Sequence, residues 1–254
     1  MKIALCLSGF VGNANKWLEG VELDYNYGYE YLNDSILNNG DVDVFIHSYS
    51  LEHEKGLRDL YKPVKATFEP NPDFKFRGEI SKDDLSSPYT FCIQSMWYSR
   101  KCAVDLAIKH EEENNFKYDF VLLTRFDIAL FKKFEFEKYD TSKLYIAGPI
   151  IYNKTSKGTT VPYKINDMYF MANSDLLKGV VGVSDTYENI AINLNSNWPM
   201  EKVSSHIIIT EQLLRKNIFD KVECLFTRPW ESSTAWNSNA DIRFLRSDPG
   251  VKYI

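Results

Sequence analysis

The sequence has few cysteines and few histidines, and neither type is arranged as a metal or disulfide motif. Its four cysteines are scattered, and no two of them form a C-x-x-C pair. Its four histidines show no H-E-x-x-H motif and no Cys/His metal spacing. We therefore expect reduced structural thiols rather than a disulfide framework. The four cysteines are Cys6, Cys92, Cys102 and Cys224.

Long apolar runs and an excess of positive charge are also absent. The apolar run Ile3–Leu7 is too short for a signal peptide or a membrane span. The longest run, Phe120–Phe131, is interrupted by Arg125 and Asp127. With 35 acidic against 30 basic residues the net charge is −5, whereas nucleic-acid binding needs a clustered basic surface. The sequence therefore predicts a cytoplasmic protein that has no transmembrane segment and binds no nucleic acid.

The common nucleotide-binding loops are missing as well. Only two residues separate Gly9 from Gly12, so the G-x-x-x-x-G-K-[ST] spacing fails, and G-x-G-x-x-G is not present. The segment Ser8–Asn13 still follows an apolar strand and carries two glycines, which let a backbone approach a ligand closely. A ligand loop and an ordinary strand-to-helix turn both remain open.

Aromatic residues are plentiful. The 254 residues include 16 Phe, 16 Tyr and 5 Trp, which is 15% of the chain, while 44% of residues are hydrophobic and 26% charged. This composition is that of a globular protein with an ample core. Many Phe residues, such as Phe45, Phe120 and Phe170, fall in expected strands, whereas Tyr and Trp fall more often in loops and past strand ends. Tyr pairs an apolar ring with a hydroxyl group, so the excess fits a core, an interface or a carbohydrate-binding surface.

Expected strands alternate with expected helices along the chain, which predicts an α/β fold with a mostly parallel sheet flanked by helices. The length suits one domain over residues 1–254, in which 230–254 is a C-terminal tail or a lid. The apolar patterns predict strands at Ile3–Leu7, Val42–His47, Val64–Phe68, Phe120–Leu130, Lys143–Tyr152, Asp167–Met171 and Val222–Phe226. They predict helices at Tyr29–Leu37, Leu51–Leu60, Tyr89–Asn114, Ser174–Val181 and Ser205–Lys216.

Arg125 and Asp127 are the sharpest candidates for a site, because they interrupt the most apolar strand of the chain. Residues two apart on a strand point to one face, and burying ionised groups is costly unless they are paired or bound to a ligand. They could pair with each other. Alternatively, the strand ends here and Asp127 presents its carboxylate to Mg²⁺ or Mn²⁺, with a substrate diphosphate completing the shell.

Three further polar residues lie near expected strand ends or on a helix. His47 ends the second strand and could hydrogen-bond a ligand or be a satisfied structural histidine. Asp167 opens a short apolar strand, where it is either a second polar contact or a turn residue. Glu211 lies on an amphipathic helix and could serve as a base, although a solvated glutamate is the commoner case.

Five segments occur in an order that resembles a group of bacterial and viral glycosyltransferase-like proteins of surface polysaccharide or glycan synthesis. The resemblance extends from about Met1 to Phe226, and the order of the motifs is its specific part. The segments are K-I-A-L-C-L-S-G, D-V-D-V-F-I-H-S-Y, Y-D-F-V-L-L-T-R-F-D-I, N-D-M-Y-F-M-A and T-E-Q-L-L.

The resemblance implies a GT-A-like, Rossmann-type domain and a transferase that moves a sugar from a nucleotide-sugar donor to a glycan or other hydroxyl acceptor. Four residues would bind the donor, namely Ser8, Gly9, His47 and Arg125. Three carboxylates would be catalytic, namely Asp127, Asp167 and Glu211. Asp127 would also hold Mn²⁺ or Mg²⁺, because Arg125-Phe126-Asp127 stands where such enzymes usually carry an Asp-x-Asp metal motif.

Two departures from the family pattern keep other functions open. Phe10-Val11-Gly12 replaces the usual Gln-Pro-Arg and so removes a phosphate-binding type of residue. Arg125 replaces the first carboxylate of the metal motif. One alternative is a catalytically inactive glycan-binding protein of the same fold. The other is a sulfotransferase, for which Gly12-x-x-x-Lys16 supplies half of a phosphate loop.

Overall fold

A seven-stranded sheet forms the centre of the protein. The computed structural model describes residues 1–12, 23–74, 88–151, 164–192, 204–225, 230–231 and 242–244. The strand order in the sheet is β10-β6-β9-β4-β1-β2-β3. These strands are β1 (Lys2–Gly9), β2 (Asp41–Ser48), β3 (Lys65–Phe68), β4 (Phe120–Arg125), β6 (Leu144–Ile146), β9 (Phe170–Ala172) and β10 (Val222–Cys224).

The sheet is mostly parallel, as the sequence predicts. β1 pairs in parallel with β2 and β4, β2 with β3, and β6 with β10. Only β9 runs the other way, between β4 and β6. Parallel strands covered on both faces read as continuous apolar runs, which is the pattern of β1 and β4.

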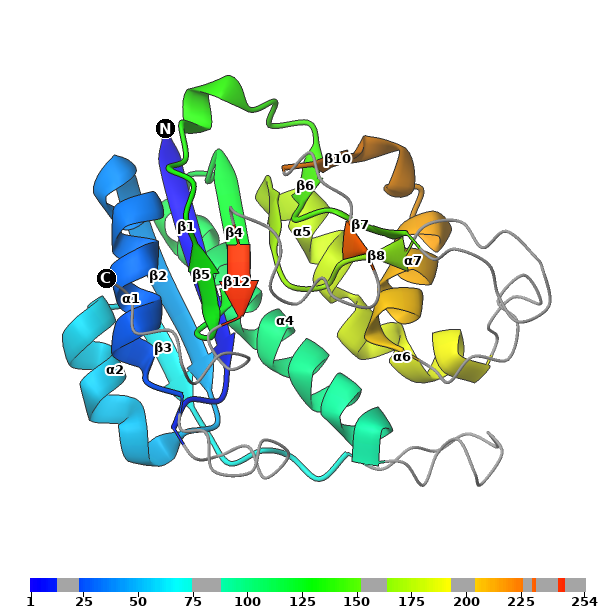
Figure 1. Ribbon diagram of the computed structural model, residues 1–254, viewed down its shortest axis with the longest axis horizontal. Coiled ribbons are helices and arrows are strands. Elements are labelled where there is room, and N and C mark those ends of the chain that lie inside the picture. Colours follow the sequence, from blue (N-terminus) through cyan, green and yellow to red (C-terminus); the bar gives the residue numbers. More distant parts are fainter. Residues whose placement is uncertain are drawn as a thin grey trace.

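Helices cover both faces of the sheet (Figure 1). Helices α1 (Tyr25–Ser35) and α2 (Glu54–Tyr61) pack on the face that contains Leu5 and Leu7. The opposite face, which contains Ala4 and Cys6, is covered by four helices. These are α4 (Pro88–Asn114), α5 (Ser174–Val181), α6 (Val183–Ile192) and α7 (Ser205–Arg215).

Two small sheets and four short 3₁₀ helices complete the described chain. β7 (Pro149–Ile151) pairs with β8 (Lys164–Ile165) and β11 (Trp230–Glu231), and β5 (Ile128–Leu130) pairs with β12 (Ile242–Phe244). The strands β11 and β12 belong to the segment 230–254, so its described parts pack as edge strands. The 3₁₀ helices are Leu37–Asn39, Leu51–His53, Phe136–Lys138 and Phe219–Lys221.

The structure corrects several of the predicted boundaries. The strand predicted at Phe120–Leu130 is broken into β4 and β5, which lie in different sheets, and Asp127 is in the turn between them. Helix α1 starts four residues before the predicted Tyr29, because the side chain of Asp24 accepts a hydrogen bond from the Asn26 N–H and caps it.

The structure also divides one more predicted strand and contains one helix that was not predicted. The strand predicted at Lys143–Tyr152 divides into β6 and β7, and helix α6 was not predicted at all. Several interpreted positions lie outside the described residues. These are Asn13, Lys16, the predicted loop Asn153–Thr160, Trp198, Trp236, residues 75–87 of the expected surface excursion and most of 230–254.

The order of the chain through the sheet reverses at β1. β2 and β3 follow β1 on one side, whereas β4 lies on the other side. In an open α/β sheet, a ligand binds beyond the carboxyl ends of the strands at such a reversal. The fold therefore points to the carboxyl ends of β1 and β4. Among the helices of the described residues, none is both long and apolar enough to cross a membrane.

Candidate functional site

Three of the residues predicted as donor-binding form a row across the carboxyl edge of the sheet. Ser8 at the end of β1 is in register with His47 of β2 on one side and with Arg125 of β4 on the other. Paired residues of parallel strands project to the same face. That face is covered by α4, whose middle contributes Ser99 and Arg100 to the same region.

Arg125 and Asp127 bind each other, which was one of the two alternatives left open by the sequence. Nε and Nη2 of Arg125 donate to the two carboxylate oxygens of Asp127 at 2.8 and 2.5 Å. The Asp127 side chain is 1% exposed and that of Arg125 is 24% exposed. Burial lowers the pKa of Arg125, but the charge and hydrogen bonds of Asp127 outweigh it, so the pKa is raised. Arg125 therefore stays cationic at the edge of the site.

This pairing bears on the predicted metal. Both oxygens of Asp127 accept hydrogen bonds from Arg125, and a divalent cation would have to displace that guanidinium group. Arg125 already supplies the positive charge at this position. As they stand, the two side chains do not fit a Mn²⁺ or Mg²⁺ site.

Arg100 is a site residue that the sequence analysis missed. It is 1% exposed, its guanidinium group lies 4.6 Å from the centre of the Trp97 ring, and its Nη2 donates to the Asp167 backbone carbonyl at 2.5 Å. Its Nη1 lies 3.7 Å from Asp167 Oδ2 and has no hydrogen-bond partner among the described residues. Burial, aided by Arg125 and opposed by Asp167, lowers the pKa of Arg100 to about 10, so it remains charged near neutral pH.

A signal for Arg100 was present in the helical pattern. The residues around it at helical spacing, Trp97, Ala103 and Val104, are buried and apolar. A charged residue inside such a stripe faces the core and must find a partner there. The sequence alone did not identify that partner, because Asp167 is 67 residues away.

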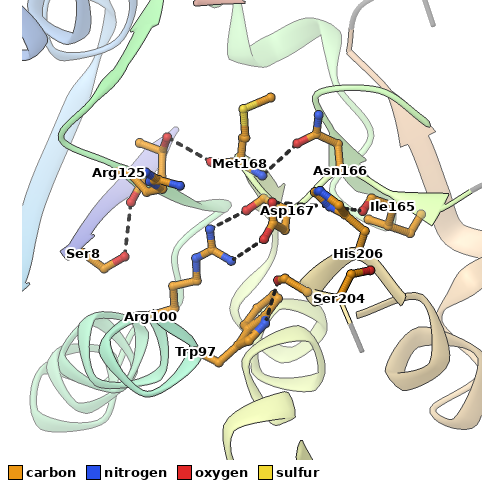
Figure 2. A network of polar contacts seen from close by, with 12 residues as sticks. Ser8, Trp97, Arg100, Arg125, Ile165, Asn166, Asp167, Met168, Ser204 and His206 are labelled. Atoms are coloured by element: carbon orange, nitrogen blue, oxygen red, sulfur yellow. Dashed lines mark hydrogen bonds and ion pairs between the residues drawn. The ribbon is translucent and has the colours of Figure 1, made fainter. Parts of the chain in front are cut away.

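Five ionisable side chains form a charged cluster at the site, namely Arg100, Arg125, Asp127, Asp167 and His206. Asp167 lies between Arg100 and His206 (Figure 2). It is 7% exposed and faces Arg100 from α4 and His206 from α7, with His206 Nδ1 at 3.5 Å from Asp167 Oδ1. Burial raises the pKa of Asp167, but the charges of His206, Arg100 and Arg125 and a hydrogen bond from Ser205 lower it to about 2. The carboxylate is therefore ionised at any pH near neutrality.

The low pKa of Asp167 predicts a specific acid sensitivity. Because its pKa falls from the ordinary 3.8 to about 2 on folding, the ionised group stabilises the protein above about pH 4. We expect a contribution of roughly 2 kcal/mol to the free energy of unfolding, lost as the pH falls from about 4 to about 2. Urea unfolding of the wild type and Asp167→Asn across this range measures it. A difference between the two proteins that does not change with pH would contradict the assignment.

The end of β1 and the residues after it are held by three serines, which come from β2, from the segment that follows β2 and from α4. Gly9 donates its N–H to Ser99 Oγ at 3.1 Å and accepts from Ser48 Oγ at 2.7 Å, and the Val11 N–H donates to Ser50 Oγ at 3.0 Å. These N–H groups are therefore engaged within the protein rather than directed at a phosphate. Gly9 has φ +111°, and no described atom lies within 4 Å of a Cβ built there, so a ligand can approach its backbone.

His47 lies at the edge of the site, but both of its ring nitrogens contact side chains of the protein. It is fully buried, with Nδ1 at 2.8 Å from Ser99 Oγ and Nε2 at 3.0 Å from Glu69 Oε1. Burial lowers the pKa of His47, although Glu69 opposes the shift. This neighbourhood matches the structural alternative for His47 better than a direct contact with a donor.

Glu211 is on the same helix as His206 but one turn or more farther along. Its side chain is 8% exposed, and its Oε2 lies 3.5 Å from Arg215 Nε, in the direction of the helix C-terminus. The preceding residue, Thr210, binds the end of β8, because its Oγ1 accepts a hydrogen bond from the Ile165 N–H at 2.9 Å. The structure therefore brings Arg125, Asp127 and Asp167 together around Arg100, whereas Glu211 pairs with Arg215 on α7.

Comparison of the sequence with models of known protein families finds no match, and comparison with curated proteins finds no significant relative.

Proposed function

We propose that this protein is a glycosyltransferase that moves a sugar from a nucleotide-sugar donor to a hydroxyl group of a glycan. The observation that carries the proposal is the pair of arginines, Arg100 and Arg125, at the carboxyl ends of β1 and β4. This is the ligand-binding position of an open α/β sheet, and two guanidinium groups there suit an anionic ligand.

The reaction would need positive charge beside the bond between the sugar and the nucleoside diphosphate, which breaks during transfer. As the sugar leaves, the nucleoside diphosphate gains negative charge, and fixed cations placed beforehand stabilise that charge. Arg125 would contact the diphosphate, since its side chain is partly exposed. Arg100 would offer Nη1, which makes no hydrogen bond to a described residue. The two arginines would thus do what a divalent cation does in the metal-dependent scheme.

A carboxylate would receive the proton of the acceptor hydroxyl group if the reaction inverts the configuration of the sugar. Asp167 is a weak base, because its pKa is about 2. Its low pKa suits it better for orienting a hydroxyl group by accepting a hydrogen bond. Glu211 is the other of the two candidate bases, and it would have to turn from Arg215 toward the acceptor.

The proposal includes the finer features that the sequence resemblance implies. These are a GT-A-type fold, a role in surface polysaccharide synthesis and a cytoplasmic setting. The strand order β3-β2-β1-β4, with β9 reversed beyond it, supports a nucleotide-binding half built on the first four parallel strands. Mn²⁺ or Mg²⁺ at Asp127 stays a prediction that requires Arg125 to release the carboxylate.

A thermal-shift screen with UDP-, GDP- and CMP-sugars, each with and without Mn²⁺, tests the function. A donor present at about 100 times its Kd stabilises a protein by about 2.7 kcal/mol. For a domain of this size we expect the Tm to rise by roughly 5–10 °C. A rise that does not need Mn²⁺ would support the arginine scheme, whereas a rise only with Mn²⁺ would restore the metal at Asp127.

The same screen also includes a free glycan and an adenosine phosphosulfate, and two of its outcomes would contradict the proposal. A rise only with free glycan would indicate a glycan-binding protein without transferase activity. A rise only with an adenosine phosphosulfate donor would indicate sulfotransfer. The matched control is Arg58→Met, which removes an exposed arginine on α2 that pairs with Glu54 and lies outside the cluster. This variant should respond to the donor as the wild type does.

A further inference from the structure

Three side chains of the metal-ligating types meet beside the row of polar residues at the sheet edge. His47 comes from β2, Glu69 follows β3 directly, and Cys102 comes from α4. The nitrogen, oxygen and sulfur atoms that they offer all lie within 4.8 Å of one another. The closest pair joins His47 Nε2 to Glu69 Oε1 at 3.0 Å. These residues are far apart in the sequence, so no motif spacing indicates the cluster.

Hydrogen bonds of Ser99 orient the His47 ring. Ser99 Oγ accepts from the Gly9 N–H at 3.1 Å, and its hydroxyl group donates to the His47 carbonyl at 3.3 Å. A serine hydroxyl group has one hydrogen and two acceptor sites. When that hydrogen goes to the carbonyl, Nδ1 is the donor in the 2.8 Å contact with Ser99 Oγ. The lone pair of the neutral ring is then on Nε2 and points at the Glu69 carboxylate. When the hydrogen goes to Nδ1 instead, Nε2 carries the proton and donates it to Glu69.

In the first arrangement, the Nε2 lone pair and the Glu69 carboxylate oxygen are 3.0 Å apart and repel each other unless a cation binds both. We infer that His47, Glu69 and Cys102 bind a zinc ion. Imidazole nitrogen, carboxylate oxygen and thiolate sulfur together suit Zn²⁺, whereas Mg²⁺ and Mn²⁺ prefer oxygen ligands. The donation from Nδ1 to Ser99 is the outer-shell hydrogen bond that a zinc-bound histidine makes.

The chemistry of the site follows from its ligand set. On binding, the Cys102 thiol gives its proton to solvent and the sulfur bonds to zinc, while Nε2 and the Glu69 carboxylate bind through existing lone pairs. Three protein ligands leave a fourth position of the tetrahedron for water. The side chain of Glu69 is 34% exposed, so the site opens to solvent on that side.

Zinc at this position would join three elements that are separate in the chain. It would fix the end of β2, the segment after β3 and the middle of α4 to one another. Ser99 connects the same site to the Gly9 backbone by one hydrogen bond. The inference does not depend on the proposed transferase activity, because it concerns different side chains and a different ligand.

Titration of untagged, chelator-treated protein with Co²⁺ tests the site, because cobalt reports a thiolate ligand by a charge-transfer absorption band. We expect one equivalent of Co²⁺ to produce that band and one equivalent of Zn²⁺ to remove it. Cys102→Ser should abolish the band. It should also weaken zinc binding by more than the roughly 10- to 100-fold that loss of an outer-shell partner costs.

Cys92→Ser is the matched control, since Cys92 is a partly buried free cysteine on the same helix. It should keep both the cobalt band and the affinity for zinc. Absence of a stoichiometric band in the wild type would overturn the inference, and this measurement does not depend on the folding of any variant. That result would indicate that Nε2 carries a proton and donates it to Glu69. Equal losses in Cys92→Ser and Cys102→Ser would overturn it as well.

Discussion

Replacing Arg125 by methionine is expected to lower the free energy of unfolding by about 3–5 kcal/mol, because it leaves a buried carboxylate without its cation. Asp127 is 1% exposed, and both of its oxygens accept hydrogen bonds from this one guanidinium group. Methionine fills much of the same volume, so the loss comes from removing the cation that binds a buried carboxylate rather than from a cavity. Urea unfolding at neutral pH measures the effect.

Two further variants distinguish the loss of the Arg125–Asp127 ion pair from a general effect of substitution on stability. Arg125→Met with Asp127→Leu removes both charges and should regain most of the lost stability, as buried pairs replaced by apolar residues do. Lys55→Met removes a partner of the exposed pair with Asp59, and we expect it to change stability by less than about 1 kcal/mol. If Arg125→Met behaves like Lys55→Met, the pair is not a buried one in solution.

The double variant also separates structure from function. It should fold, yet it lacks the cation that we assign to the diphosphate of the donor. We therefore expect no rise in its Tm with any nucleotide sugar that stabilises the wild type. A full donor response in this folded variant would show that Arg125 serves only to pair with Asp127.

Replacing Arg100 by methionine is expected to weaken donor binding about 10- to 150-fold. A hydrogen bond to a charged group contributes about 1.5–3 kcal/mol, and Arg100 Nη1 is a buried donor with no hydrogen-bond partner among the described residues. Isothermal titration with the donor found in the screen measures the change. Arg58→Met on the surface is the control and should bind as tightly as the wild type.

Arg100→Lys distinguishes the shape of the guanidinium group from its charge. Lysine keeps the cation beside Asp167 but cannot reproduce the planar contact with Trp97 or the fork of donors. We expect an affinity between those of the wild type and Arg100→Met. If both variants bind the donor as the wild type does, Arg100 supports Asp167 only, and the proposed contact with the diphosphate is wrong.

Much of the fold could be predicted from the sequence, because β1 and β4 are continuous apolar runs and α4 carries a clear helical spacing. Such patterns require burial on both faces of a strand or on one stripe of a helix. The strand predicted at Phe120–Leu130 runs through the break between β4 and β5, since Phe126 and Ile128 keep the apolar pattern through the turn. An end of the strand at Asp127 was only one of two alternatives that the sequence left open. Local pattern does not show where a strand leaves its sheet.

The site was predicted in part. Arg125 and Asp127 stand out because two charges in an apolar strand need a partner, and the sequence could name the mutual pair as one solution. Arg100 and His206 could not be attached to Asp167 in the same way. They lie on two helices, and only the packing of α4 and α7 against the sheet brings them within reach of one carboxylate.

By itself, the sequence determined an α/β protein with a mostly parallel sheet and two charged residues at the end of its most apolar strand. These features follow from the periodicity of apolar residues and from the free-energy cost of burying charge, which are both local. The tertiary structure decided that Arg125 holds Asp127, that Arg100 stands beside them, and that His47, Glu69 and Cys102 meet. Contacts of this kind depend on register and helix packing, which join residues that no spacing in the chain connects.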